Sequence, residues 1–85
     1  MRRRHDELEA AWWELQDATP AGWIVGRPYF HDERNEWEQY ARDTIDRPPK
    51  RDQIREWIAI GPTEIECVRE MARCMREIAE GRPPR

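Results

Sequence analysis

The sequence predicts an α+β fold of two layers in the order α-β-β-β-α, a three-stranded antiparallel sheet packed by two helices on one face. Two observations predict it. Apolar residues recur at helical spacing near both ends of the chain, and strand-forming residues separated by turn residues fill its middle. At 85 residues the chain is expected to be a single domain over residues 1–85. Its ordered core should span about residues 5–81, between a basic N-terminal tail and a proline-rich C-terminal tail.

The first predicted element is a helix over residues 5–18. Apolar residues recur at helical spacing over residues 8–15, and acidic residues occupy the first turns, where the helix dipole favours negative charge. The turn-forming residues 19–22 end it. Trp13 points away from the apolar stripe, so this ring is either covered from a second side or exposed.

Three strands are predicted next, over residues 22–30, 36–45 and 53–60. The first is rich in strand-forming residues, and Pro28 within it cannot donate a ladder hydrogen bond, so this strand should be an edge or should bend. Residues 36–45 also fit an amphipathic helix, and their local propensity leans that way. We favour a strand, because a hairpin with the preceding strand supplies the sheet with a pairing partner.

Alternation in the third strand separates its two faces. Ile54, Ile58 and Ile60 share one side, and Trp57 lies on the other. Because the stripes of the helices are mostly aliphatic, we expect the isoleucines to face the helices and Trp57 to face the open side of the sheet.

The last element is the clearest, a helix from Thr63 to Glu80. Thr63 followed by Glu66 is a capping-box pattern, and an apolar stripe runs over residues 65–79. Gly81 ends the helix, and the two prolines after it prevent a restart.

Large rings suggest how the protein could act. Charged residues make up 39% of the chain and apolar residues 38%, so its core must be thin, yet it carries five tryptophans. The rings either fill that core or form an exposed aromatic surface, and exposed tryptophans mark interfaces. The second alternative predicts a non-enzymatic interaction module, a homodimer or a subunit of an assembly. Its interface residues would be Trp13, Trp37 and Trp57.

Binding of nucleic acid is the alternative function. The residues that would contact phosphates are Arg69, Arg73 and Arg76 on the last helix and Arg47, Lys50 and Arg51 in the loop before the third strand, with the basic N-terminal arm. The net charge of −3 argues against nucleic-acid binding. The basic residues at the two ends offset part of the negative charge, so the rest of the chain is still more acidic. Glutamates beside the helix arginines also predict an ion-paired, solvated face.

Catalysis, metal binding and a cofactor are not expected. The chain has no serine, no glycine-rich phosphate loop and no closely spaced cysteine and histidine ligands. Cys67 and Cys74 lie seven residues apart on one predicted helix. That spacing is about 10.5 Å, too far for a disulfide. No signal peptide or membrane-spanning run is seen, so a cytoplasmic protein with reduced thiols is expected.

Two resemblances add to this interpretation. The predicted order of elements resembles that of double-stranded RNA-binding domains, which grip phosphates with lysines at the start of their second helix. Residues 63–66 read Thr-Glu-Ile-Glu at that place, and this acidity opposes RNA binding. The patterns W-x-x-Y-A-x-D from Trp37, R-E-W-x-A from Arg55, T-E from Thr63 and V-R-E-M-A-R-C from Val68 resemble a small family of uncharacterised bacterial proteins. That resemblance implies no activity.

Overall fold

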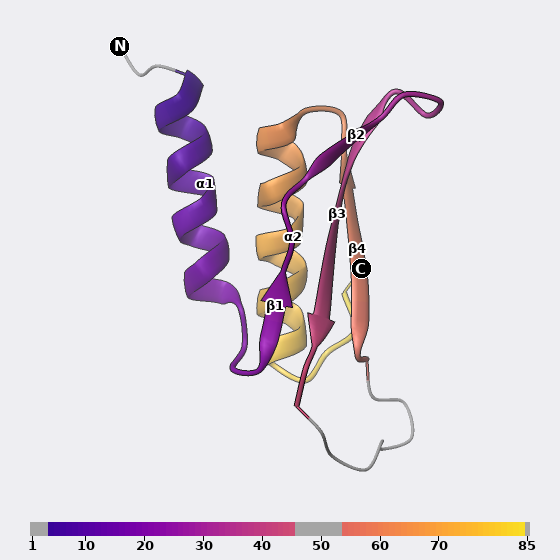
Figure 1. The fold of residues 1–85 in the computed structure, drawn as a ribbon. Coiled ribbons are helices and arrows are strands. Elements are labelled where there is room, and N and C mark those ends of the chain that lie inside the picture. The colour runs from indigo at the N-terminus through magenta and orange to yellow at the C-terminus, as the bar shows by residue number, and fades with distance from the viewer. Residues whose placement is uncertain (1–3, 46–53, 85) are drawn as a thin grey trace.

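The computed structural model describes residues 4–45 and 54–84 and has two helices and four strands. The elements are α1 (Arg4–Ala18), β1 (Trp23–Val25), β2 (Tyr29–His31), β3 (Glu36–Asp43), β4 (Glu56–Gly61) and α2 (Glu64–Ala79). Both helices lie on the same side of an antiparallel sheet (Figure 1). The predicted α+β class is therefore confirmed.

The sheet is built around β3. β1 and β2 both pair with one edge of β3, and β4 pairs with the other edge. Pro28 lies between β1 and β2, so the predicted first strand is present but interrupted at the residue that cannot donate a ladder hydrogen bond. The N–H of Gly26 still donates to the carbonyl oxygen of Tyr40 at 2.9 Å, which keeps this interrupted strand against β3. The strand predicted over residues 36–45 is confirmed, against its local helix propensity.

The register shows which side of the sheet the helices cover. Ala41 lies opposite Trp57, and Ala59 lies opposite Gln39. The two alanines belong to the buried core with α2 residues, so this set of side chains faces the helices. Tyr40 lies opposite Ile58, and by the period-2 alternation of a strand this pair faces the other way.

The prediction for the faces of the third strand was therefore wrong. Ile58 and Ile60 lie on the side away from the helices, Trp57 packs against the core, and Ile54 lies half-buried ahead of β4. The reason is the closeness of α2 to the sheet. A Cβ atom at Gly61 would lie 2.6 Å from the backbone nitrogen of Cys67, so isoleucines on this side would hold α2 too far away.

The core lies chiefly around α2. Its buried apolar members outside the cysteines are Ala11, Leu15, Ala41, Ala59, Val68, Met71, Ala72 and Met75. α2 packs on β3 and β4, while the main neighbour of α1 is α2 rather than the sheet. Thr63 caps α2 as predicted, because its Oγ1 accepts a hydrogen bond from the N–H of Glu66 at 3.1 Å.

Candidate functional site: the open face of the sheet

The side of the sheet away from the helices exposes large apolar side chains from all four strands. We call this surface the open face. Its apolar residues, each more than 40% exposed, are Ile24, Tyr29, Tyr40, Ile58 and Ile60. An isolated exposed apolar side chain is ordinary on a protein surface, but a contiguous group on one sheet face indicates a contact surface.

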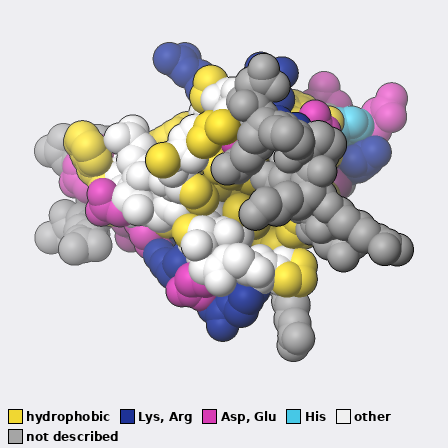
Figure 2. Space-filling model, turned by 90° about the horizontal axis from the view of Figure 1, so that it is seen from below, with side chains coloured by type: hydrophobic (Ala, Val, Ile, Leu, Met, Phe, Trp, Pro, Cys, Tyr) yellow, Lys and Arg dark blue, Asp and Glu magenta, His cyan; other side chains and the backbone are white. Residues whose placement is uncertain are grey.

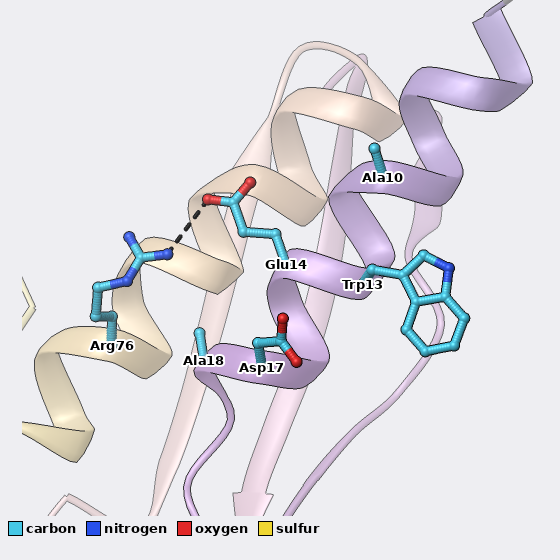
Figure 3. Close-up of a pocket in the computed structure, with 6 residues that line it drawn as sticks. All are labelled: Ala10, Trp13, Glu14, Asp17, Ala18 and Arg76. Carbon is cyan, nitrogen blue, oxygen red and sulfur yellow. Dashed lines mark hydrogen bonds and ion pairs between the residues drawn. The ribbon is translucent and has the colours of Figure 1, made fainter.

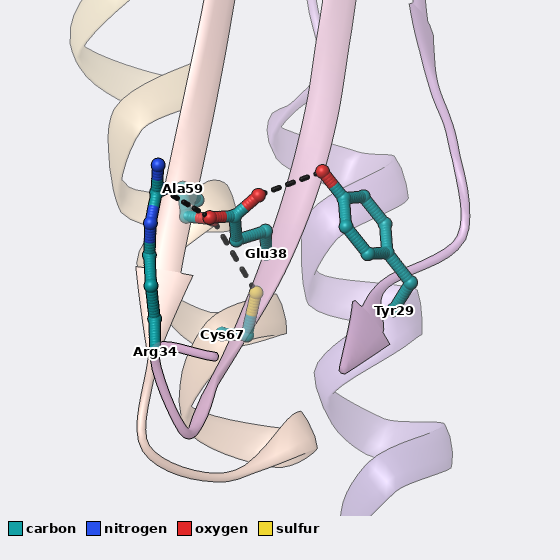
Figure 4. Close-up of polar contacts among 5 residues, drawn as sticks. All are labelled: Tyr29, Arg34, Glu38, Ala59 and Cys67. Carbon is teal, nitrogen blue, oxygen red and sulfur yellow. Dashed lines mark hydrogen bonds and ion pairs between the residues drawn. The ribbon is translucent and has the colours of Figure 1, made fainter. Parts of the chain in front are cut away.

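Beside the apolar residues, Glu38 is held by two polar partners. The Tyr29 hydroxyl donates to Glu38 Oε2 at 2.7 Å, and Arg34 Nη1 donates to Glu38 Oε1 at 2.8 Å (Figure 4). The Tyr29 hydrogen bond and then the Arg34 charge lower the pKa of Glu38. The same hydrogen bond raises the pKa of Tyr29 to about 12. Only 5% of Glu38 is exposed, so little of its carboxylate is available to a partner.

The remaining charges at the centre of the open face are of opposite sign. Arg42 on β3 lies directly opposite Glu56 on β4. Opposite charges at such positions attract across a strand pair. The open face therefore carries large apolar side chains beside charged residues of both signs.

The open face is hollowed beside Gly26. A depression of about 340 Å³ is lined by Ile24, Gly26, Tyr40, Ala41, Arg42 and Glu56. Gly26 has no side chain to fill it. The hollow thus lies over β1 and β3 and reaches Glu56 of β4, and Ile58 and Ile60 lie beside it on β4.

The predicted interface tryptophans are not brought together. Trp13 is 60% exposed, and it borders an open groove between α1 and α2 with Glu14, Asp17 and Arg76 (Figure 3). Trp37 is half-buried on the helix side of the sheet and packs edge-to-face on Phe30, with ring centroids 5.7 Å apart. Trp57 is half-buried against the core. The expectation that Trp57 faces the uncovered side is corrected, because β4 presents Ile58 and Ile60 there, and the register places Trp37 on the helix side as well.

The residues that form the open face were not predicted from the sequence as a contact surface. Four of them lie within the predicted strands and alternate as predicted, namely Ile24, Tyr40, Ile58 and Ile60. The available signal was the small size of Ala41, Ala59 and Gly61, because small residues mark the side on which a helix packs closely.

The arginines proposed for phosphate contact are largely engaged with acidic groups. Arg73 donates from Nε to Glu70 Oε1 at 2.6 Å, and this hydrogen bond raises the pKa of Arg73. Arg76 pairs with Glu14 of α1 at 3.3 Å, and Arg69 is exposed. Arg47, Lys50 and Arg51 lie outside the described residues. In the end view of Figure 2, the arginine side chains lie in separate groups next to Asp and Glu side chains rather than forming one basic surface.

Cys67 and Cys74 are free and buried. Burial is the main cause that raises the pKa of both thiols, that of Cys67 to about 11. Within residues 4–45 and 54–84, no group of His, Cys, Asp and Glu residues is placed to hold a metal ion. Neither helix of this described part has the length and apolar character needed to cross a bilayer. Comparison with protein-family models, curated proteins and solved structures finds no match.

Proposed function

We propose that this protein is a non-enzymatic interaction module that self-associates by packing its open face against the open face of a second copy. One observation carries the proposal: five large apolar side chains, each more than 40% exposed, lie together on a sheet side that neither helix covers. Two sheets packed face to face with interdigitated apolar side chains are a common way to bury such surfaces.

The size of the open face supports a weak dimer. Neighbouring strands lie about 4.8 Å apart, and each residue extends a strand by about 3.4 Å. A face that is three strands wide and as long as the eight residues of β3 therefore has an area of roughly 400 Å². That is within the roughly 300–600 Å² of the largest apolar patch on an ordinary monomer, and about half the roughly 800 Å² that each partner contributes to a standard interface. We therefore expect a dimer that dissociates in the micromolar range and depends strongly on concentration.

The charges of the open face support burial against an identical surface. Burying an unpaired charge is costly, but Glu38 already binds Tyr29 and Arg34, and Arg42 lies opposite Glu56. A strongly basic or acidic partner would find no matching excess of charge here. A second copy presents the same surface, on which the acidic and basic groups are also matched in number.

Sedimentation equilibrium over a wide range of protein concentrations tests the proposal. The wild-type protein should shift from monomer to dimer. Tyr40→Asp places a carboxylate at the centre of the open face and should leave only monomer, and Ile60→Lys should act in the same way. Trp13→Asp is the matched control, because it removes a large ring of similar exposure, 60% against 52% for Tyr40, from the helix side and should leave the dimer intact.

The outcomes separate the alternatives. Wild-type protein that stays monomeric at millimolar concentration would overturn the proposal. Loss of the dimer in Trp13→Asp, with Tyr40→Asp unaffected, would move the contact to α1. Circular dichroism of each variant shows whether a monomer is still folded.

A further inference from the structure

We infer that the outer edge of β4 binds an extended segment of another polypeptide, which pairs with β4 as a further strand of the sheet. The contact is the edge of the sheet rather than its open face, so this inference goes beyond the self-association proposed above. It is carried by the backbone groups that β4 leaves unpaired, by the composition of this edge and by the position of α2 above it (Figure 1).

The backbone groups of β4 alternate between the two sides of the strand. The N–H of Asp43 donates to the carbonyl oxygen of Arg55 at 2.8 Å, so these two residues form a hydrogen-bonded pair of the antiparallel ladder. Every second residue after Arg55 therefore also points its N–H and C=O towards β3. The N–H and C=O groups of the residues between them, Glu56, Ile58 and Ile60, point to the outer edge.

These outward groups have no protein partner among the described residues. The only strand that pairs with β4 within residues 4–45 and 54–84 is β3, and no backbone hydrogen bond joins Glu56, Ile58 or Ile60 to a loop or helix of this part. All three residues are exposed. A row of ladder donors and acceptors with the spacing that a further strand needs therefore faces outward.

The two edges of the sheet differ in their protection. Natural edge strands are commonly short or carry prolines, lysines or bulges, which oppose pairing with another chain. The opposite edge has two of these features, because β1 and β2 have three residues each and Pro28 between them has no N–H. β4 has six residues in unbroken register with β3 and contains neither proline nor lysine. Its one charged residue, Glu56, lies at its start, so the rest of this edge is open to strand addition.

The position of α2 favours an extended segment over a second copy of this chain. α2 packs more extensively on β4 than on β3, and it approaches β4 closely at Gly61. If two copies paired their β4 strands about an antiparallel two-fold axis, both α2 helices would lie on one side of the joined sheet, above neighbouring strands. Neighbouring strands are about 4.8 Å apart, whereas packed helices need about 8–10 Å. A segment that carries no helix on that side meets no such obstacle.

The side chains of β4 specify the chemistry of the segment. Residues directly opposite each other in a ladder project to the same face, so residues paired with Ile58 and Ile60 lie beside them on the open face. β-branched apolar residues suit those two positions, and a basic residue suits the position opposite Glu56. The alternate residues project to the helix side, where threonine combines strand propensity with a polar group. The expected partner therefore alternates apolar and polar residues and carries one lysine or arginine.

A synthetic peptide of the sequence Thr-Val-Thr-Val-Thr-Lys-Thr, blocked at both ends, tests this pairing. Its valines are placed to pair with Ile60 and Ile58, and its lysine with Glu56. N-methylation of both valines removes N–H groups that donate to β4 and should weaken binding by about tenfold or more. The matched control is N-methylation of the threonine after each valine, which removes N–H groups that face away from β4 and should leave binding nearly unchanged.

Amide hydrogen exchange followed by NMR locates the contact on the protein. In the free protein, the amides of Ile58 and Ile60 should exchange rapidly, whereas those of Trp57 and Ala59 are protected by their hydrogen bonds to β3. Binding of the peptide should slow the exchange of Ile58 and Ile60. An unchanged exchange rate at these two residues in the presence of bound peptide would place the contact elsewhere and overturn the inference.

One substitution removes a single outward donor. Ile58→Pro deletes the central outward N–H without deleting a hydrogen bond to β3, so it should weaken peptide binding by about tenfold. Ile58→Thr is the matched variant, because it keeps the N–H and the β-branched shape and should bind nearly as the wild type does. Circular dichroism shows whether each variant is folded. If Ile58→Pro does not fold, the two N-methylated peptides still decide the question.

The inference and the proposed self-association fail separately. Binding of the peptide by Tyr40→Asp supports the edge contact whether or not the wild-type protein dimerises through its open face. Equal binding of the two N-methylated peptides, or no binding of the unmodified peptide at millimolar concentration, overturns the edge contact alone. Loss of wild-type self-association in Ile58→Pro but not in Ile58→Thr, without peptide binding, would assign this edge to a second copy and also overturn the inference.

Discussion

A single methyl group added at Gly61 should cost considerable stability. The added Cβ would lie 2.6 Å from the backbone nitrogen of Cys67 and 2.9 Å from its Cα. These atoms belong to the backbone of α2, so no side-chain rotation relieves the contact and the helix must move away from β4. Because α2 carries Met71 and Met75 of the core, that movement loosens packing throughout the domain.

The magnitude follows from two opposing effects. Overpacking of a core costs about 1–3 kcal/mol, and we take the upper value because backbone must move. Replacing glycine by alanine also restricts the unfolded chain, which returns about 0.4–1 kcal/mol. Gly61→Ala should therefore lose about 2 kcal/mol, which lowers the melting temperature of a domain this small by roughly 8–16 °C.

Urea denaturation followed by tryptophan fluorescence, at one low protein concentration, measures this difference. The control is Gly26→Ala, whose Cβ meets nothing closer than 3.7 Å and which should gain about 0.4–1 kcal/mol from the restricted unfolded chain alone. The two variants should thus differ by about 3 kcal/mol. Equal midpoints for the two variants would refute the close approach of β4 and α2.

The remaining predictions concern titration. The pKa of Tyr29 is raised to about 12. Its protonated phenol therefore contributes fully to the free energy of unfolding below the ordinary pKa of 10.0, and this contribution is lost as the pH rises through 12. Glu38→Gln should return the phenol absorbance titration of Tyr29 towards 10.0, and an unchanged titration would exclude their hydrogen bond. The pKa of Glu38 is lowered, so its contribution is lost as the pH falls through that value. Cys67 and Cys74, buried with raised pKa values, should react with a thiol reagent only on unfolding.

The elements of this fold could be predicted from the sequence because their signals are local. The capping pattern of Thr63 and the helical stripe after it belong to α2 alone, and both are confirmed. The interruption at Pro28 follows from the chemistry of one residue. Residues 36–45 needed a non-local argument, because only pairing with neighbouring strands outweighs their helix propensity.

The face of each strand could not be predicted in the same way. Alternation divides a strand into two sets of side chains, but it does not say which set meets the helices. Hydrophobicity favoured Ile58 and Ile60 for the covered side. The deciding property was size, since α2 lies too close to β4 for anything larger than Ala59 and Gly61 at the contact. Because the wrong side of this strand was assigned to the helices, the site was predicted at tryptophans, whereas the exposed residues are isoleucines and Tyr40.

The position of α1 as the outermost layer has a consequence for local opening. Among the side chains of α1 whose burial is described, Ala11 and Leu15 are fully buried, and the helix rests on α2 rather than on the sheet. Detachment of α1 would leave the β-sheet and its contacts with α2 unbroken, and such partial openings need less free energy than global unfolding. Among the helices and strands, amide hydrogen exchange should accordingly be faster in α1 than where α2 lies on β3 and β4. The first helix can then unfold locally while α2 and the sheet remain folded as a smaller cooperative unit.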